Sequence, residues 1–179
     1  MRLLSFLFLC CSLCFSHKVT AQKSANEILK EACQQAAKEK KNVFVIFHAS
    51  WCGWCHKMDS AMNDNACKPL FNNNYVIRHL VVLESDNKKN FETPGALDLL
   101  KKYNGDNQGI PYWLILDKNG NLLADAQIRP EGAGLEEAGK NTGCPATPEE
   151  IAHFLKVLKK TSVLNTDQLA VIKKRFSKN

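Results

Sequence analysis

The chain has 179 residues, of which 45% are apolar and 23% charged, the proportions of an ordinary globular protein large enough to bury a core. Its formal net charge is +6. Without Arg2 and Lys18, which precede residue 22, 22 basic and 18 acidic side chains remain, which leaves +4. So small an excess gives no reason to expect a nucleic acid as partner.

Residues 1–21 have the pattern of a secretory signal peptide. Arg2 supplies a positive start, an apolar stretch follows, and residues 19–21 include small side chains suited to cleavage. We therefore expect a single mature domain of residues 22–179, periplasmic or secreted, without stable membrane insertion after cleavage. Two alternatives stay open, which are a retained N-terminal anchor and lipid attachment at Cys10, Cys11 or Cys14.

The first half of the mature chain alternates helices and strands. Ser24 and Glu27 have the spacing of a capping box, which predicts a helix reaching Lys41. The apolar residues 43–48 predict a buried strand, and residues 52–62 a helix that follows it closely. The next predicted elements are a short helix capped by Asp64 and ending at Phe71, a turn at 72–74, a strand at 75–83, a polar loop at 84–93 and a helix at 94–103.

The second half begins with a hairpin signal. Residues 112–116 and 122–126 flank an Asn-Gly pair, which accepts the positive φ of a tight turn. We expect residues 127–146 to form a long loop containing glycine and proline. Two helices close the chain, one from the capping box of Thr147 and Glu150, the other at about 166–176. This order predicts an α/β fold in which helices flank a mixed β-sheet.

Two cysteines stand where the first strand gives way to the second helix. Cys52 would lie at the helix N-terminus, where free N–H groups and the helix dipole favour a thiolate. Cys55 follows one turn later, within reach for a disulfide. Such a pair can attack the disulfide of another protein and then resolve the mixed intermediate.

Two motifs carry a family resemblance. The segment Trp51-Cys52-Gly53-Trp54-Cys55 resembles the thioredoxin active site, and residues 109–120 resemble the thioredoxin segment that holds the cis-proline, a strand and an Asn-Gly turn. The arrangement is similar to exported thioredoxin-like proteins akin to the C-terminal domain of the thiol:disulfide interchange protein DsbD. The resemblance implies a thioredoxin-like fold, here with an extra C-terminal helix.

The resemblance also implies an enzyme, a protein-disulfide oxidoreductase with no cofactor and no metal. Cys52 would be the nucleophile and Cys55 the resolving thiol. Substrate-binding residues would be Trp51, Gly53, Trp54, Ile110 and Pro111. Expected partners are protein disulfides and an upstream thiol electron donor, and we expect a monomer that acts as a reductase, because no histidine or other cation stands between the two cysteines to stabilise the thiolate further.

One position departs from the thioredoxin pattern. Thioredoxins carry a buried aspartate six residues before the first cysteine, and here that position is Ile46. The proton that leaves Cys55 therefore needs another acceptor. Glu84, at the end of the second strand, is the candidate, with water as the alternative.

Other functions remain open at this level. Cys52, Cys55 and His56 also spell the Cys-x-x-Cys-His pattern of covalent c-type haem attachment. A zinc site that adds His48 lacks a second pair of cysteines, and a redox-silent binding module is a further alternative. The expectation that His56 lies buried behind a strand argues against haem. The remaining thiols, Cys33, Cys67 and Cys144, are expected to stay unpaired.

Overall fold

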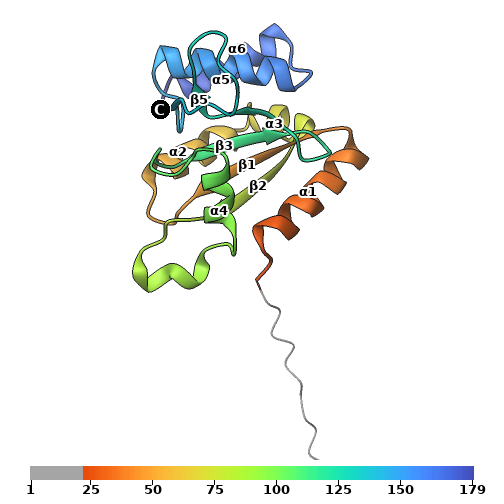
Figure 1. Cartoon of the computed structure of the whole chain (residues 1–179). Helices are drawn as coiled ribbons and strands as arrows, with labels where there is room; N and C mark the ends of the chain where they lie inside the picture. The colour runs from red at the N-terminus through yellow and green to blue at the C-terminus, as the bar shows by residue number, and fades with distance from the viewer. Residues whose placement is uncertain (1–21) are drawn as a thin grey trace, which may run out of the picture.

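The computed structural model describes residues 22–179 (Figure 1), so the predicted signal peptide and its cysteines lie outside the described residues. The helices are Ala25–Glu39 (α1), Gly53–Met62 (α2), Lys68–Asn74 (α3), Ala96–Lys102 (α4), Pro148–Thr161 (α5) and Thr166–Phe176 (α6), with a 3₁₀ helix at Asp86–Phe91 (η1). The strands are Asn42–His48 (β1), Tyr75–Val81 (β2), Tyr112–Leu116 (β3), Leu122–Asp125 (β4), Gln127–Ile128 (β5) and Lys140–Asn141 (β6). None of the helices in this range is both long enough and apolar enough to cross a membrane.

Four strands form one mixed sheet in the order β2-β1-β3-β4. β1 pairs in parallel with β2 and antiparallel with β3, and β3 forms an antiparallel hairpin with β4. Helices α1 and α4 lie on one side of the sheet and α5 and α6 on the other (Figure 1). This double cover explains why β1 is buried without alternation from Val43 to Phe47. The predicted fold, a mixed sheet between helices with an added C-terminal helix, is confirmed.

Capping residues begin the helices where the sequence predicted them. Both hydrogen bonds of a capping box form between Ser24 and Glu27 at α1, and again between Thr147 and Glu150 at α5. Each box satisfies backbone N–H groups that the first helical turn leaves without partners.

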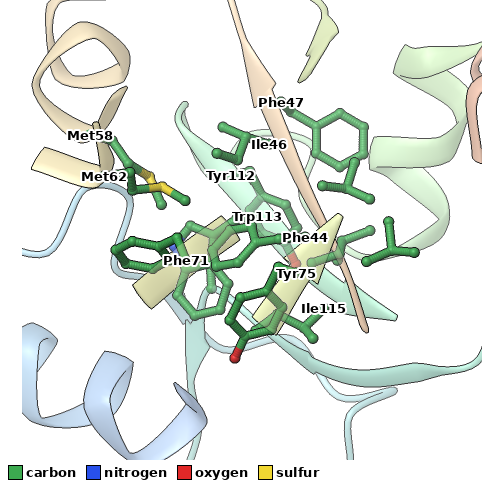
Figure 2. Close-up of a cluster of buried hydrophobic side chains, with 14 of the residues drawn as sticks. Phe44, Ile46, Phe47, Met58, Met62, Phe71, Tyr75, Tyr112, Trp113 and Ile115 are labelled. Atoms are coloured by element: carbon green, nitrogen blue, oxygen red, sulfur yellow. The ribbon is translucent and has the colours of Figure 1, made fainter. Parts of the chain in front are cut away.

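A cluster of buried side chains, most of them aromatic, lies on the sheet (Figure 2), and Phe71 of α3 and Phe154 of α5 join it to these helices. The ring centroid of Phe44 lies between 5.5 and 6.5 Å from those of Phe71, Tyr75, Trp113 and Phe154. Met58, Ala61 and Met62 on one face of α2 are buried as well. The helix that carries the two cysteines is therefore fixed on the sheet by its own apolar face.

The short helix after α2 differs from the prediction. It begins at Lys68 instead of near Asp64, and it runs through residues 72–74, where we predicted a turn. The amide of Asn74 explains the longer helix, because its Nδ2 donates to the Leu70 carbonyl oxygen and its Oδ1 accepts from Val163 N–H. The asparagine-rich turn signal at 72–74 is thus overridden by a contact with a segment 89 residues away.

Two predicted loops contain regular structure. Residues 84–93 include the 3₁₀ helix η1, and the long loop at 127–146 is pinned at its base by the β5–β6 pair. In that pair Gln127 lies opposite Asn141 and Ile128 opposite Lys140. The segment after β4 is therefore tied to the body of the molecule at both ends.

Candidate functional site: a dithiol at a helix N-terminus

The first cysteine of the motif caps the second helix. Cys52 is the N-cap residue of α2, and its sulfur accepts a hydrogen bond from the backbone N–H of Cys55 at 3.1 Å. The two residues form a disulfide bond. In the reduced protein the same N–H group and the positive end of the helix dipole lie against Cys52 Sγ, where they stabilise a thiolate.

The disulfide is almost fully buried, whereas the two indole rings of the motif are exposed. Cys52 is 3% exposed and Cys55 1%, whereas Trp51 is 59% and Trp54 48% exposed. Lys57 Nζ lies 4.1 Å from the centroid of the Trp54 ring. The tryptophans therefore form the exposed apolar rim expected around the motif, next to sulfur atoms that contact solvent only slightly.

The structure brings the second sequence motif against the first. The Ile110–Pro111 peptide bond is cis, and the carbonyl oxygen of Ile110 lies 3.4 Å from Cys52 Sγ, across 58 residues of sequence. Ile110 also packs against Ala49 and both cysteines. A hollow of about 320 Å³ adjoins this contact, and its lining includes Trp54, Ile110, Pro111, Gly143 and Glu150.

Glu84 lies close to the motif but holds its backbone instead of its sulfur atoms. The carboxylate accepts hydrogen bonds from the Ser50 N–H and, at 2.8 Å, from the Ser50 hydroxyl. The Ser50 N–H is the chief cause of a lowered pKa at Glu84, with help from the hydroxyl and from the charge of Lys88. The carboxylate therefore holds the turn before Cys52 through Ser50, and the role of Glu84 as proton acceptor stays a prediction.

A second contact reinforces the same turn. The Trp51 indole N–H donates to the Leu83 carbonyl oxygen at 2.8 Å, and the Glu84 N–H donates to a carboxylate oxygen of Glu92 at the same distance. We call the Ser50–Glu84 pair the turn anchor. Sequence analysis missed Ser50 and Leu83, because nothing local connects them to residues more than 30 positions away.

Buried Ile46 offers no group that could take up a proton, and two histidines lie on the neighbouring strands β1 and β2. The His48 and His79 rings lie 5.0 Å apart, and His79 Nε2 lies 2.7 Å from Asp59 Oδ1. Burial, and then the charge of His79, lowers the pKa of His48.

Among residues 22–179, no three His, Cys, Asp or Glu side chains are grouped so as to hold a metal ion.

The expectation for His56 is wrong. Its side chain is exposed instead of buried behind a strand, and its Nε2 lies 3.0 Å from the Ser50 carbonyl oxygen. Its position after Cys55 on the first turn of α2 turns it outward, away from the sheet. His56 thus contacts the same turn that Glu84 holds from the other end.

The other thiols of the described chain are unpaired, as predicted. Cys67 and Cys144 are buried and Cys33 is partly buried. Burial raises the pKa of all three, that of Cys144 to about 12. Only Cys52 combines a place in the disulfide with the N-terminus of a helix.

Comparison with known proteins is informative at the level of the family. A family model described as thioredoxin-like matches residues 25–118, just over half of the chain. Similar solved structures include a disulphide isomerase from Xylella fastidiosa Temecula1, at 20% identity and a TM-score of 0.47, over 56% of this chain and 72% of that one. A structure named DsbH Oxidoreductase has 19% identity and a TM-score of 0.44, over 77% and 83% of the two chains. The oxidised C-terminal domain of Neisseria meningitidis DsbD has 22% identity and a TM-score of 0.40, over 59% and 84%.

A comparison with curated proteins gave no match. The matched range begins at the first residue of α1 and ends just after β3, so it includes both the Cys52–Cys55 disulfide and the Ile110–Pro111 segment. With the mixed sheet, the dithiol at a helix N-terminus and the segment before β3 in contact with it, the chain belongs to the thioredoxin-like family.

Proposed function

We propose that this protein is an exported thiol–disulfide oxidoreductase that reduces protein disulfides through Cys52 and Cys55. The observation that carries the proposal is the Cys52–Cys55 disulfide at the start of α2, with a backbone N–H on Cys52 Sγ and the Ile110 carbonyl 3.4 Å away. A disulfide across three residues closes too short a loop to add much stability, so a chemical role accounts for it better than a structural one.

The reaction needs only the two thiols and the substrate disulfide. The Cys52 thiolate attacks one substrate sulfur, a bond forms between them, and the other substrate sulfur leaves as a thiolate. Cys55 loses its proton to water and attacks Cys52 Sγ, which breaks the mixed disulfide and releases the second substrate sulfur. Two electrons pass from the dithiol to the substrate, and an upstream dithiol protein restores the reduced pair.

The residues around the disulfide suit a protein substrate. Trp51 and Trp54 offer exposed aromatic surface on either side of the sulfurs. A Cβ atom placed on Gly53 would meet nothing within 4 Å, so the space above the motif is open. We assign Ile110 and Pro111 to the wall that receives the substrate backbone, because they border the adjoining hollow.

Reduction is the favoured direction because little beyond the helix stabilises the thiolate. Gly53 and Trp54 provide no cation between the cysteines, and His56 is engaged with the Ser50 carbonyl. We expect a reduction potential nearer the roughly −270 mV of thioredoxin than the roughly −120 mV of a strong oxidant. Equilibration with glutathione buffers measures it, and a value above about −180 mV would replace the reductase by an oxidase or isomerase.

Insulin reduction tests the activity itself. The wild-type protein should reduce insulin disulfides with dithiothreitol as electron source, Cys52→Ser should have no activity, and Cys55→Ser should accumulate mixed disulfides. Retained activity in Cys52→Ser would disprove the assignment. A wild-type protein without activity would point to a binding module, and a Soret band in its absorbance spectrum to a haem protein.

The remaining parts of the proposal concern the form in which the protein works. We propose cleavage of residues 1–21, a periplasmic or secreted monomer, and protein thiols as partners. The intact mass of exported protein should correspond to a chain that begins at Gln22, whereas a higher mass with an attached lipid would identify an anchored form.

A further inference from the structure

Asn141 makes an unusually dense set of contacts for a partly exposed side chain. From its place at the end of β6, its Nδ2 lies 3.1 Å from the carbonyl oxygens of Gln108 and Gly109 and 3.2 Å from that of Pro111, and its two N–H groups are shared among the three. Its Oδ1 accepts from Gly143 N–H at 2.9 Å. One amide thus joins the segment before β3 to the segment after β6.

The carbonyl groups that Asn141 binds belong to irregular backbone. Asn107 and Gly109 have positive φ angles of 60° and 77°, and the segment pairs with no strand before Tyr112. Backbone carbonyls outside helices and sheets take hydrogen bonds from side chains or from water, and the exposed Gly109 can use either. Here a single side chain supplies them, and the Gln108 Oε1 accepts in return from Asn141 N–H at 3.4 Å.

Asn141 is itself held by the sheet. Gln127, its partner across the β5–β6 pair, donates from Nε2 to the Tyr112 hydroxyl and accepts from Gly139 N–H. The next residue, Thr142, donates its N–H to the Ala126 carbonyl at 2.8 Å.

A buried ion pair closes the base of the same hairpin. Arg129 binds both carboxylate oxygens of Asp125, at 2.8 and 2.7 Å, and their side chains are only 7% and 1% exposed. Arg129 also donates to the carbonyl oxygens of Leu135 and Glu137, so the long segment between β5 and β6 folds back onto this pair. The support behind Asn141 is therefore rigid.

We propose that Asn141 is a positioning residue for disulfide exchange, which holds the Gln108–Pro111 segment at the distance from Cys52 that a protein substrate requires. The proposal rests on the proposed function. Ile110 lies between two carbonyls fixed by Asn141 and is the residue whose own carbonyl reaches Cys52 Sγ. We call Asn141 with its three carbonyls the loop anchor.

The loop anchor should matter for large substrates more than for small ones. A protein substrate has to lie along Ile110 and Pro111 while its disulfide meets Cys52, so a displaced segment costs alignment. A small disulfide such as 5,5′-dithiobis(2-nitrobenzoate) reaches Cys52 without that segment. The ratio of the two activities therefore separates positioning from general loss of structure.

The experiment uses Asn141→Asp, which keeps the acceptor for Gly143 N–H but loses the donor to the three carbonyls. We expect kcat/KM for insulin to fall about tenfold, mainly through KM, with the rate on the small disulfide within about twofold of wild type. Asn141→Ser, which keeps one donor, should fall between the two and serves if the carboxylate prevents folding. Asn72→Asp on exposed α3 is the matched control, since Asn72 makes no side-chain hydrogen bond to residues 22–179.

Each outcome decides the matter. An unchanged ratio of the two activities in folded Asn141 variants would overturn the positioning role, and so would a parallel loss of both activities, which signals a structural effect alone. If wild-type protein reduced the small disulfide but not insulin, the proposed function would fail and the inference with it, whereas the Asn141 variants test the inference only against an active wild type.

Discussion

The two segments that meet at the disulfide are held in chemically opposite ways. At the turn anchor a buried carboxylate, Glu84, accepts two hydrogen bonds from Ser50, so an ionised group holds backbone and hydroxyl donors. At the loop anchor a neutral amide, Asn141, donates to three carbonyls. The turn anchor lies within the range that the family model matches, whereas Asn141 lies 23 residues beyond its end at 118 and binds carbonyls inside it.

The different positions of the two anchors indicate which part of the reaction each one supports. The turn anchor positions the attacking residue itself, because Ser50 is two residues from Cys52. The loop anchor positions the surface against which a substrate lies. A change at the first should therefore affect every substrate, and a change at the second mainly protein substrates.

Replacing the charged anchor should have the largest combined effect on protein and small disulfides, because it should lower both activities. Glu84→Gln keeps one acceptor but loses the charge that two Ser50 donors share, so we expect kcat/KM to fall about fivefold to tenfold for insulin and for a small disulfide alike. Glu31→Gln, at an exposed carboxylate on α1, is the control and should match wild type. A loss confined to insulin would mean that Glu84 acts like Asn141, and a pH profile that lost its acid limb in Glu84→Gln would support Glu84 as the proton acceptor.

Acid should weaken one anchor and not the other. The pKa of Glu84 is lowered in the folded protein, so its contribution to stability is complete above the unfolded carboxyl pKa of about 4.3 and is lost as the pH falls through the folded value. Denaturant titrations should show a stability difference between wild type and Glu84→Gln that is constant near neutral pH and shrinks below about pH 4.

Acid should strengthen the loop contact in the Asn141→Asp variant, whereas it weakens the Glu84 contact in the wild-type protein. Protonation gives its carboxyl group an O–H donor for the facing carbonyls, so part of the lost loop contact should return at low pH. A stability difference from wild type that grew on acidification would contradict this account of the loop anchor.

The smallest effect is expected at Cys144, because it follows Gly143, the residue whose N–H Asn141 also binds. In the reduced wild-type protein, Cys52 should react with iodoacetamide near neutral pH, and Cys144 should react far more slowly because it is buried with a pKa raised to about 12. Loosening the loop anchor with Asn141→Asp should raise Cys144 modification about twofold to threefold through local opening. Peptide mapping by mass spectrometry measures each site. Equal labelling of Cys144 in wild type and variant would show that the loop anchor and Gly143 move independently.

Local patterns in the sequence were enough to predict most of the fold. Strong patterns such as the apolar run of β1, the Asn-Gly turn between β3 and β4, and the capping box at Thr147 each depend on residues a few positions apart. The predictions failed where a distant partner decided the conformation, as when Val163 extends α3 through Asn74. The β5–β6 pair was missed for the same reason, since two-residue strands leave almost no pattern.

The candidate site was predictable only in its chemistry. The motif identified Cys52 and Cys55, and the resemblance placed Pro111 near them. Their supports, Ser50 with Glu84 and Asn141 with Pro111, are separated by 34 and 30 residues and have no spacing that marks them. Such pairs become visible only when the strands that carry them are assembled.

The placement of the tryptophans gives the molecule an optical signal of its own. The chain has three, of which Trp51 and Trp54 flank the disulfide in solvent and Trp113 is fully buried in the aromatic core. Disulfides quench nearby excited indoles by accepting an electron, and thiols do so less. Two of the three emitters therefore sit beside the bond that changes, and intrinsic fluorescence should brighten on reduction, which lets the redox state be followed in real time without a label.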